Sequence, residues 1–257
     1  MSDRFSKIAF KQIVRKEWMD RTLELVCAGV SEKEIRQYMD NYLSTQQQRG
    51  GEGVKRNKET YGMTLSMLSC WFRDDELNSF RRALANEAKK VDRSRWLPFH
   101  MAILSASYPF WLCVCNEAGK LFFKQDLISS AQIYDKMKAI YGDRETIARN
   151  TRYAIRTMVS WGFMDDVPEQ RGCYHQGQKT EVLNPKAISL LLESLLWANK
   201  YGRSGFEDLC RNPGLFGFRL DSVSAGMIES LSNGRIERMS YGMSDEYLCL
   251  RAEDDHF

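Results

Sequence analysis

The sequence has little of what metal and disulfide chemistry requires. It contains three histidines, far apart in the chain, and seven cysteines, an odd number spread over 257 residues without a CxxC pair. Structural zinc sites need clustered cysteine or histidine ligands, and small secreted scaffolds need a dense, even set of cysteines. The chain also opens on a polar, charged stretch and not on a secretory signal. We therefore expect a cytoplasmic protein with no metal site and no cofactor.

Signature motifs of common enzymes are also missing. There is no GxSxG, HExxH or Walker sequence, and the glycines within residues 44–58 lack the strand and the GK[ST] ending of a phosphate loop. The spacing of carboxylates and lysine that a nuclease would need does not occur either. These absences predict a protein that is not an enzyme. The alternative is metal-dependent cleavage at the adjacent Asp165 and Asp166, where we expect a solvated turn.

One long stretch lacks formal charge, from Leu97 to Cys115. Its length is close to the ~20 residues that a membrane-spanning helix needs. It also contains two prolines and His100, and an element that is apolar on all sides can equally lie at the centre of a domain. We expect one or two buried helices here and no membrane partner.

Charge is distributed unevenly along the chain. Residues 1–160 hold 27 basic and 19 acidic residues, a net charge of +8, whereas residues 161–257 hold 10 and 15, a net charge of −5. With 43% hydrophobic and 12% aromatic residues, the chain can bury a core, so global disorder is excluded. A basic first portion indicates a polyanionic partner.

The pattern up to residue 118 is helical throughout, and we expect residues 1–118 to form a helical domain. Residues 44–58 are polar and glycine-rich and predict a loop, whose Lys55, Arg56 and Lys58 are one alternative cationic surface. One predicted helix ends at Gly29, and a second spans Glu32–Leu43 after a capping box formed by Ser31 and Glu34. Further helix is predicted within Thr60–Lys90.

Residues 119–183 follow a different order. Ser129 and Gln132 form a capping box that opens one helix, and Asp143 is a suitable N-cap for a second helix over 144–161. The stretches GFMDDV and CYHQGQKTEVL then predict a β-hairpin. Helix, tight turn, helix and hairpin is the order of a winged helix-turn-helix. The expected fold is mainly α, with this winged domain at 119–183 and a helical and α+β extension at 184–257, ending in a strand pair around Tyr241; no internal repeat is evident.

The second helix of that domain carries charge of one sign. At 100° per residue, Arg149, Arg152 and Arg156 lie opposite the core-facing stripe. That stripe consists of Ile147, Thr151, Ala154, Ile155 and Met158. No acidic residue occurs between Thr146 and Met164, whereas an ordinary surface helix mixes signs. Arginines suit phosphates and guanine edges, and asparagine can pair with adenine. The candidate DNA-binding residues are Arg144, Arg149, Asn150, Arg152, Tyr153 and Arg156 on the helix, and Arg171 and Lys179 in the wing.

Three segments, VCAGVSEKEI, LPFHMAILSASYPF and DRETIARNTRYAIRTMVSWGFMDD, follow one another within residues 10–183. In this arrangement the chain resembles the BrxA-type accessory proteins of bacterial phage-exclusion (BREX) islands. The resemblance implies a small, mostly helical protein that binds DNA and works with other defence-system proteins. The segment from Asn184 onward departs from the family pattern.

Two functions from different classes therefore stand as hypotheses. The first is a double-stranded DNA-binding protein that acts as a regulator or a subunit of a defence complex. The second is an adaptor whose basic helix binds acidic partner proteins and which ignores DNA. A further cluster of cations between Arg81 and Arg95 is the other alternative surface for DNA.

Overall fold

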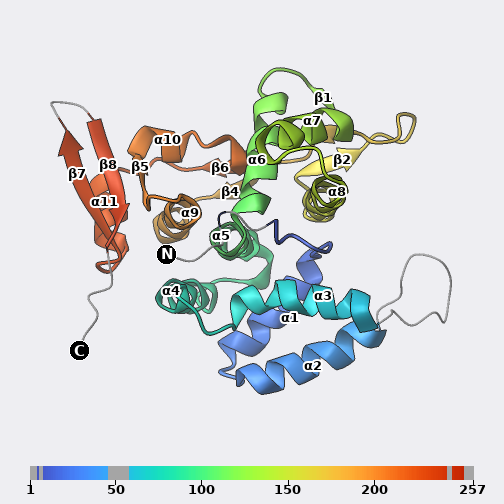
Figure 1. The fold of residues 1–257 in the computed structure, drawn as a ribbon. Helices are drawn as coiled ribbons and strands as arrows, with labels where there is room; N and C mark the ends of the chain where they lie inside the picture. The colour runs from blue at the N-terminus through green and yellow to red at the C-terminus, as the bar shows by residue number, and fades with distance from the viewer. Residues whose placement is uncertain (1–4, 6–7, 46–57, 242–244, 252–257) are drawn as a thin grey trace.

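The computed structural model describes residues 5, 8–45, 58–241 and 245–251 (Figure 1). The loop predicted over 44–58 is too long at both ends, because Ser44 and Thr45 belong to helix α2 (Glu32–Thr45) and Lys58 begins helix α3 (Lys58–Leu68). The rest of it, residues 46–57 with Lys55 and Arg56, and the acidic residues 253–255 lie outside the described residues. The fold is mostly helical with three small sheets, so the prediction of a mainly α protein is confirmed. Helices α1–α4 lie together below α5 in Figure 1, while the strands lie in the other half of the molecule.

The first half of the chain is helical, as expected. The capping box at the second helix is confirmed, because the Ser31 hydroxyl and the Glu34 carboxylate bond reciprocally to the backbone N–H groups of Glu34 and Ser31. The elements are α1 (Lys16–Cys27), α2 (Glu32–Thr45), α3 (Lys58–Leu68), η2 (Ser69–Trp71), α4 (Asn78–Ala88), η3 (Arg93–Arg95), α5 (Leu97–Ser107) and α6 (Pro109–Phe122).

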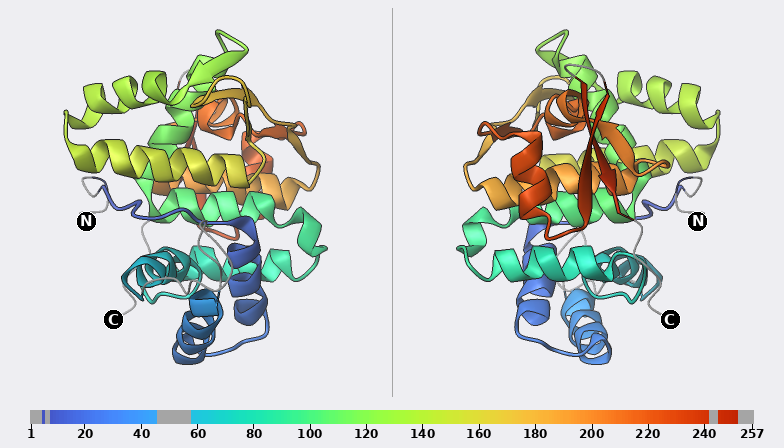
Figure 2. Two further views of the ribbon diagram at one scale, coloured as in Figure 1. Left: turned by 90° about the vertical axis from the view of Figure 1, so that its right-hand side faces the viewer. Right: turned by 90° about the vertical axis from the view of Figure 1, so that its left-hand side faces the viewer.

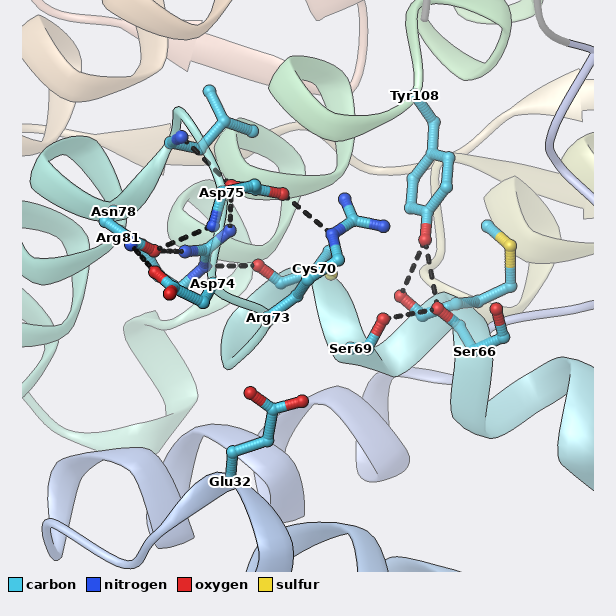
Figure 3. A network of polar contacts seen from close by, with 12 residues as sticks. Glu32, Ser66, Ser69, Cys70, Arg73, Asp74, Asp75, Asn78, Arg81 and Tyr108 are labelled. Atoms are coloured by element: carbon cyan, nitrogen blue, oxygen red, sulfur yellow. Dashed lines mark hydrogen bonds and ion pairs between the residues drawn. The ribbon is translucent and has the colours of Figure 1, made fainter.

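A turn at residues 72–77 divides the predicted helical region between Thr60 and Lys90. The Asp75 carboxylate accepts the backbone N–H of Leu77 at 2.9 Å and pairs with Arg81 at 2.8 Å. Arg81 also donates to the carbonyl of Cys70 at 2.7 Å, which joins η2 to α4 across the turn (Figure 3). An aspartate that binds backbone groups nearby favours a turn over a helix, which hydrophobic spacing alone does not reveal.

The uncharged segment forms two helices, α5 and α6, that meet at an angle of 117°. Both are largely buried, and α5 packs closely against α9 (Pro185–Ala198). Within the described residues no single helix is long and apolar enough to cross a bilayer, although the bent pair would pass by length and composition alone.

The middle of the chain forms β1 (Leu127–Ser129), α7 (Ser130–Tyr141), α8 (Glu145–Ser160), β2 (Met164–Asp166) and β3 (Cys173–Gln176). The three strands make an antiparallel sheet in the order β1-β3-β2, so the predicted hairpin gains a third strand from before α7. The capping box of Ser129 and Gln132 is confirmed. The prediction of Asp143 as N-cap is wrong: Arg144 takes that position, and Asp143 instead binds Tyr134 and Lys138 of α7.

The last third contains β4 (Thr180–Val182), α9, β5 (Arg203–Gly205), α10 (Phe206–Cys210), η4 (Pro213–Leu215), β6 (Phe218–Leu220), α11 (Ala225–Leu231), β7 (Ile236–Tyr241) and β8 (Asp245–Leu250). The expected final strand pair is confirmed as β7 and β8, with β5 as the third strand. The second strand of the predicted hairpin is too long at its C-terminal end, because residues 180–182 pair in parallel with β6 and not with β2.

The same order of elements occurs twice. Residues 109–176 (the first repeat) run α6-β1-α7-α8-β2-β3. Residues 185–250 (the second repeat) run α9-β5-α10-α11-β7-β8, with η4 and β6 inserted between α10 and α11. Both sheets are antiparallel, with the strand that comes last in the chain in the middle. Helices α6 and α9 each have 14 residues and begin with proline, and a positive-φ glycine (Gly162 and Gly234) stands two residues before β2 and β7. The structure thus contains an internal repeat that the sequence did not show.

The buried residues of both repeats and of the N-terminal helices form one continuous cluster, from Phe10 to Leu248. Phe163 of the first repeat packs against Phe216 and Phe218 of the second, with ring centroids 6.0 and 5.2 Å apart. The predicted boundary after residue 118 falls inside α6, so the first two predicted domains share a helix.

A buried imidazole lies at the centre of this core. His100 is fully buried, with rings of Trp71, Trp96 and Trp161 around it. Its Nε2 lies 2.8 Å from a carboxylate oxygen of Asp20, which Lys16 and Arg93 also bind. Burial lowers the pKa of His100, although Asp20 opposes that shift. Burial raises the pKa of Asp20, but the hydrogen bonds from His100 and Lys16 outweigh it and lower that pKa to about 2.

These two pKa shifts predict that acid destabilises the protein in two stages. In the unfolded chain His100 takes up a proton near its ordinary pKa of 6.5, while the folded state resists it, so the free energy of unfolding falls as pH drops below 6.5. The stability from Asp20 is complete above pH 3.8 and is lost as pH falls towards 2, about 2 kcal/mol in all. Urea denaturation at a series of pH values between 7 and 5 measures the free energy of unfolding. That free energy should depend less steeply on pH in His100→Gln than in the wild type. The exposed His175→Gln is the control, and an unchanged slope in His100→Gln would contradict the assignment.

Candidate nucleic-acid interface

Helix α8 has two contrasting faces, as its helical periodicity predicts. The side chains of the expected apolar stripe, including Ile147, Ile155 and Met158, are buried against the first repeat. A turn of three residues, 142–144, connects α7 to α8, and the two helices pack side by side (Figure 2, left). The sheet and α7 therefore hold α8 rigidly, with its other face directed outward.

Two of the three predicted arginines on the outer face are free. Arg149 and Arg152 are exposed and have no carboxylate within ion-pair distance among the described residues. Arg156 is different: its side chain is 26% exposed and pairs with Asp166 of β2 at 2.6 Å, which raises the pKa of Arg156. Arg144 is exposed and donates to the carbonyl of Tyr141 at 2.9 Å. The free positive charge on α8 thus lies at Arg149 and Arg152.

Asn150 does not lie on the outer face, and its prediction as a reader of base edges is contradicted. It is 2% exposed, and its amide donates to the carbonyl of Ile8 at 2.9 Å. The N-terminal segment that carries Ile8 runs along α8 and is also held where Thr157 accepts the N–H of Val14 at 3.0 Å (Figure 2, left). Tyr153 is half-buried. The segment covers this flank of the helix and removes Asn150 from solvent.

The predicted wing residues are separated by the strand pattern. Arg171 lies in the turn between β2 and β3 and is exposed. Lys179 is exposed as well, but it follows β3 and leads into β4, so it is not part of the hairpin. Of the two, the structure places only Arg171 beside α8.

A groove of about 690 Å³ joins α8 to the hairpin. The guanidinium-bearing residues Arg152, Arg156 and Arg171 all line it. Thr151 lines it too and is 1% exposed; its hydroxyl has no hydrogen-bond partner in the described part of the chain. The remaining lining residues are Ser130, Ala131, Tyr134, Ala148, Ile155, Asp166, Gly172 and Tyr174. The helical periodicity places Thr151 in the core stripe, and nothing in the sequence singles out Tyr134 or Tyr174, because the groove exists only where the hairpin meets α7 and α8.

In the alternative basic cluster at 81–95, three of the six cations are paired within the fold. Arg81 is buried and binds Asp75, Asn78 and the carbonyl of Cys70 (Figure 3). Lys90 pairs with Glu87 at 2.8 Å, and Arg93 pairs with Asp20 and Glu24. These three cations stabilise the helical region. Arg82, Lys89 and Arg95 are exposed and have no carboxylate within ion-pair distance among the described residues, so this cluster remains an alternative cationic surface.

The described residues contain no group of three or more histidine, cysteine, aspartate or glutamate side chains placed to hold a metal ion. Asp165 and Asp166 are both exposed, and Asp166 is engaged by Arg156. No family model, curated protein or solved structure matches this chain.

Proposed function

We propose that this protein is a non-enzymatic double-stranded DNA-binding protein whose first repeat acts as a winged helix-turn-helix. The proposal is supported by the order of its elements: a helix, a strand, two helices joined by a three-residue turn, and a hairpin that completes the sheet. In such modules the second helix of the pair enters the major groove. That helix is α8 here.

The observation that carries the proposal is the set of unpaired arginines on one side of the first repeat. Arg149 and Arg152 project from α8, and Arg171 projects from the hairpin beside it. Exposed guanidiniums that form no ion pair suit phosphate oxygens and the O6 and N7 atoms of guanine. With Asn150 buried, any base contacts from α8 come from Arg149 and Arg152.

The wider role follows from the sequence resemblance to BrxA-type proteins. We propose that the protein acts in the cytoplasm as a regulator or subunit of a bacterial anti-phage defence complex, together with other defence-system proteins. In the second repeat, beyond the span of that resemblance, the helix that corresponds to α8 is α11, which carries one glutamate and no arginine. DNA contact is therefore assigned to the first repeat.

A mobility-shift titration with duplex DNA of random sequence tests this function. We expect a complex whose affinity falls by about a hundredfold between ~50 and ~300 mM salt, as three phosphate contacts would produce. Plasmid incubated with the protein and Mg²⁺ should stay intact. A protein that leaves duplex unshifted at low salt would instead support the adaptor hypothesis, and cleavage abolished by Asp165→Asn or Asp166→Asn would overturn the non-enzymatic assignment.

A further inference from the structure

The groove between α8 and the β2–β3 hairpin has an unusual polar atom in its lining. The hydroxyl of Thr151 is buried and lacks a hydrogen-bond partner among the described residues, although the side chain lines the groove. A buried polar group without a partner destabilises a fold, and such groups in native structures call for an explanation. A ligand that enters the groove and accepts the hydroxyl proton supplies one.

The charge around that hydroxyl is positive. Arg152, Arg156 and Arg171 line the same groove, and Asp166 is the carboxylate that lines it with them, paired to Arg156. Arg152 and Arg171 have no carboxylate within ion-pair distance among the described residues, and they line the same groove as the Thr151 side chain. The first turn of α7, at Ser130 and Ala131, adds the partial positive charge of a helix start. Together these groups fit a phosphate, which accepts hydrogen bonds from arginine and hydroxyl donors alike.

The size of the groove and its remaining lining residues indicate a ligand larger than a single phosphate ion. A volume of about 690 Å³ lies within the usual range for small-molecule sites and far exceeds what one phosphate fills. Ala131, Ala148 and Ile155 provide apolar wall, and the rings of Tyr134 and Tyr174 provide aromatic wall. Such surfaces suit the carbon face of a sugar or a base.

We propose that this groove binds one phosphorylated sugar unit of a nucleotide, with its phosphate held by the Thr151 hydroxyl, Arg152 and Arg171. The proposal rests on the function proposed above in so far as the unit belongs to a strand of duplex DNA. A free mononucleotide offers the same chemistry, and the experiment separates the two sources.

The test compares substitutions inside and outside the groove. Thr151→Val removes the hydroxyl at nearly constant shape, and Thr151→Ser keeps it. Arg171→Ala removes a cation of the groove, while Arg149→Ala removes a cation of α8 that does not line it. Duplex affinity is measured by fluorescence anisotropy over a salt series, binding of deoxyadenosine monophosphate by calorimetry, and folding by thermal unfolding of the free protein.

We expect Thr151→Val to weaken duplex binding about tenfold with an unchanged salt slope, because it alters no charge. Its unfolding temperature without ligand should equal or exceed that of the wild type, since it removes an unpaired buried hydroxyl. Thr151→Ser should restore affinity. Arg171→Ala should weaken binding and make the salt slope shallower by about 1.

The outcomes separate this proposal from the proposed function. Wild-type duplex affinity in both Thr151→Val and Arg171→Ala, with a loss in Arg149→Ala, would overturn the groove site and leave DNA binding standing. Binding of the mononucleotide that depends on Thr151, without any duplex binding, would support the site and overturn the DNA-binding function. If Thr151→Val fails to fold, mononucleotide binding by Arg171→Ala and Arg149→Ala decides: a loss in Arg171→Ala alone supports the groove site, and wild-type binding in both variants overturns it.

Discussion

A variant with Arg149, Arg152 and Arg156 all replaced by alanine is expected to fold normally and to lose most of its affinity for duplex DNA. The first two side chains are exposed and unpaired, and alanine is the best helix former, so α8 should persist. Loss of Arg156 leaves Asp166 without its partner, but at a half-exposed site where an ion pair contributes little. The slope of log affinity against log salt should become shallower by about 2 to 3.

The second repeat provides a control of equal charge. Arg203, Arg211 and Arg219 are exposed cations there, and their replacement by alanine changes the net charge by the same amount. This control should retain wild-type affinity if the position of the arginines matters and not merely their number. Equal losses in the two triple variants would mean that binding follows net charge alone, and a normally folded first variant with full affinity would show that α8 is not the DNA-binding surface.

The largest effect on stability is expected from Arg235→Leu. Glu193 of α9 is fully buried, and its two carboxylate oxygens accept hydrogen bonds from the Arg235 guanidinium at 2.7 and 2.9 Å. Removing the arginine leaves a buried carboxylate without its partner, which destabilises proteins by about 3–5 kcal/mol. For a chain of this size the unfolding temperature should fall by about 10 °C. Urea denaturation and calorimetry measure both quantities.

The companion variant removes both charges. Because a buried ion pair can often be replaced by apolar side chains without loss, Glu193→Leu combined with Arg235→Leu should regain much of the lost stability. Arg211→Ala, which breaks an exposed pair with Glu207 at 3.1 Å, should change stability by less than about 0.5 kcal/mol. A double variant that is no more stable than Arg235→Leu would show that the pair contributes by packing and not by mutual neutralisation.

The features that could be predicted from sequence are those that depend on neighbours in the chain. The capping boxes at Ser31 and Ser129, the start of α9 at Asn184 and the buried stripe of α8 arise from residues within one or two helical turns. The features that were missed depend on distant partners. Strand β1 exists because β3 pairs with it, and β4 pairs with β6 some 38 residues later.

The candidate interface divides in the same way. The exposure of Arg149 and Arg152 follows from helical geometry alone. The burial of Asn150 could not be predicted, because the carbonyl that binds it belongs to Ile8, 142 residues away. The repeat could not be predicted for another reason: within the 14 positions of α6 and α9 only the initial proline and one glutamate are identical, Glu117 and Glu193. Topology is preserved there while side chains have diverged.

The parallel pairing of β4 with β6 has a consequence for how this chain can be inherited or dissected. Strand β4 directly follows the first repeat, but its partner lies inside the second, between η4 and α11. A gene fragment that ended between the repeats would encode a strand without its partner and an α6 stripped of the η4 segment that covers it. Neither repeat can therefore be exchanged by recombination on its own. An exchange of the second repeat would also have to supply a new partner strand for β4.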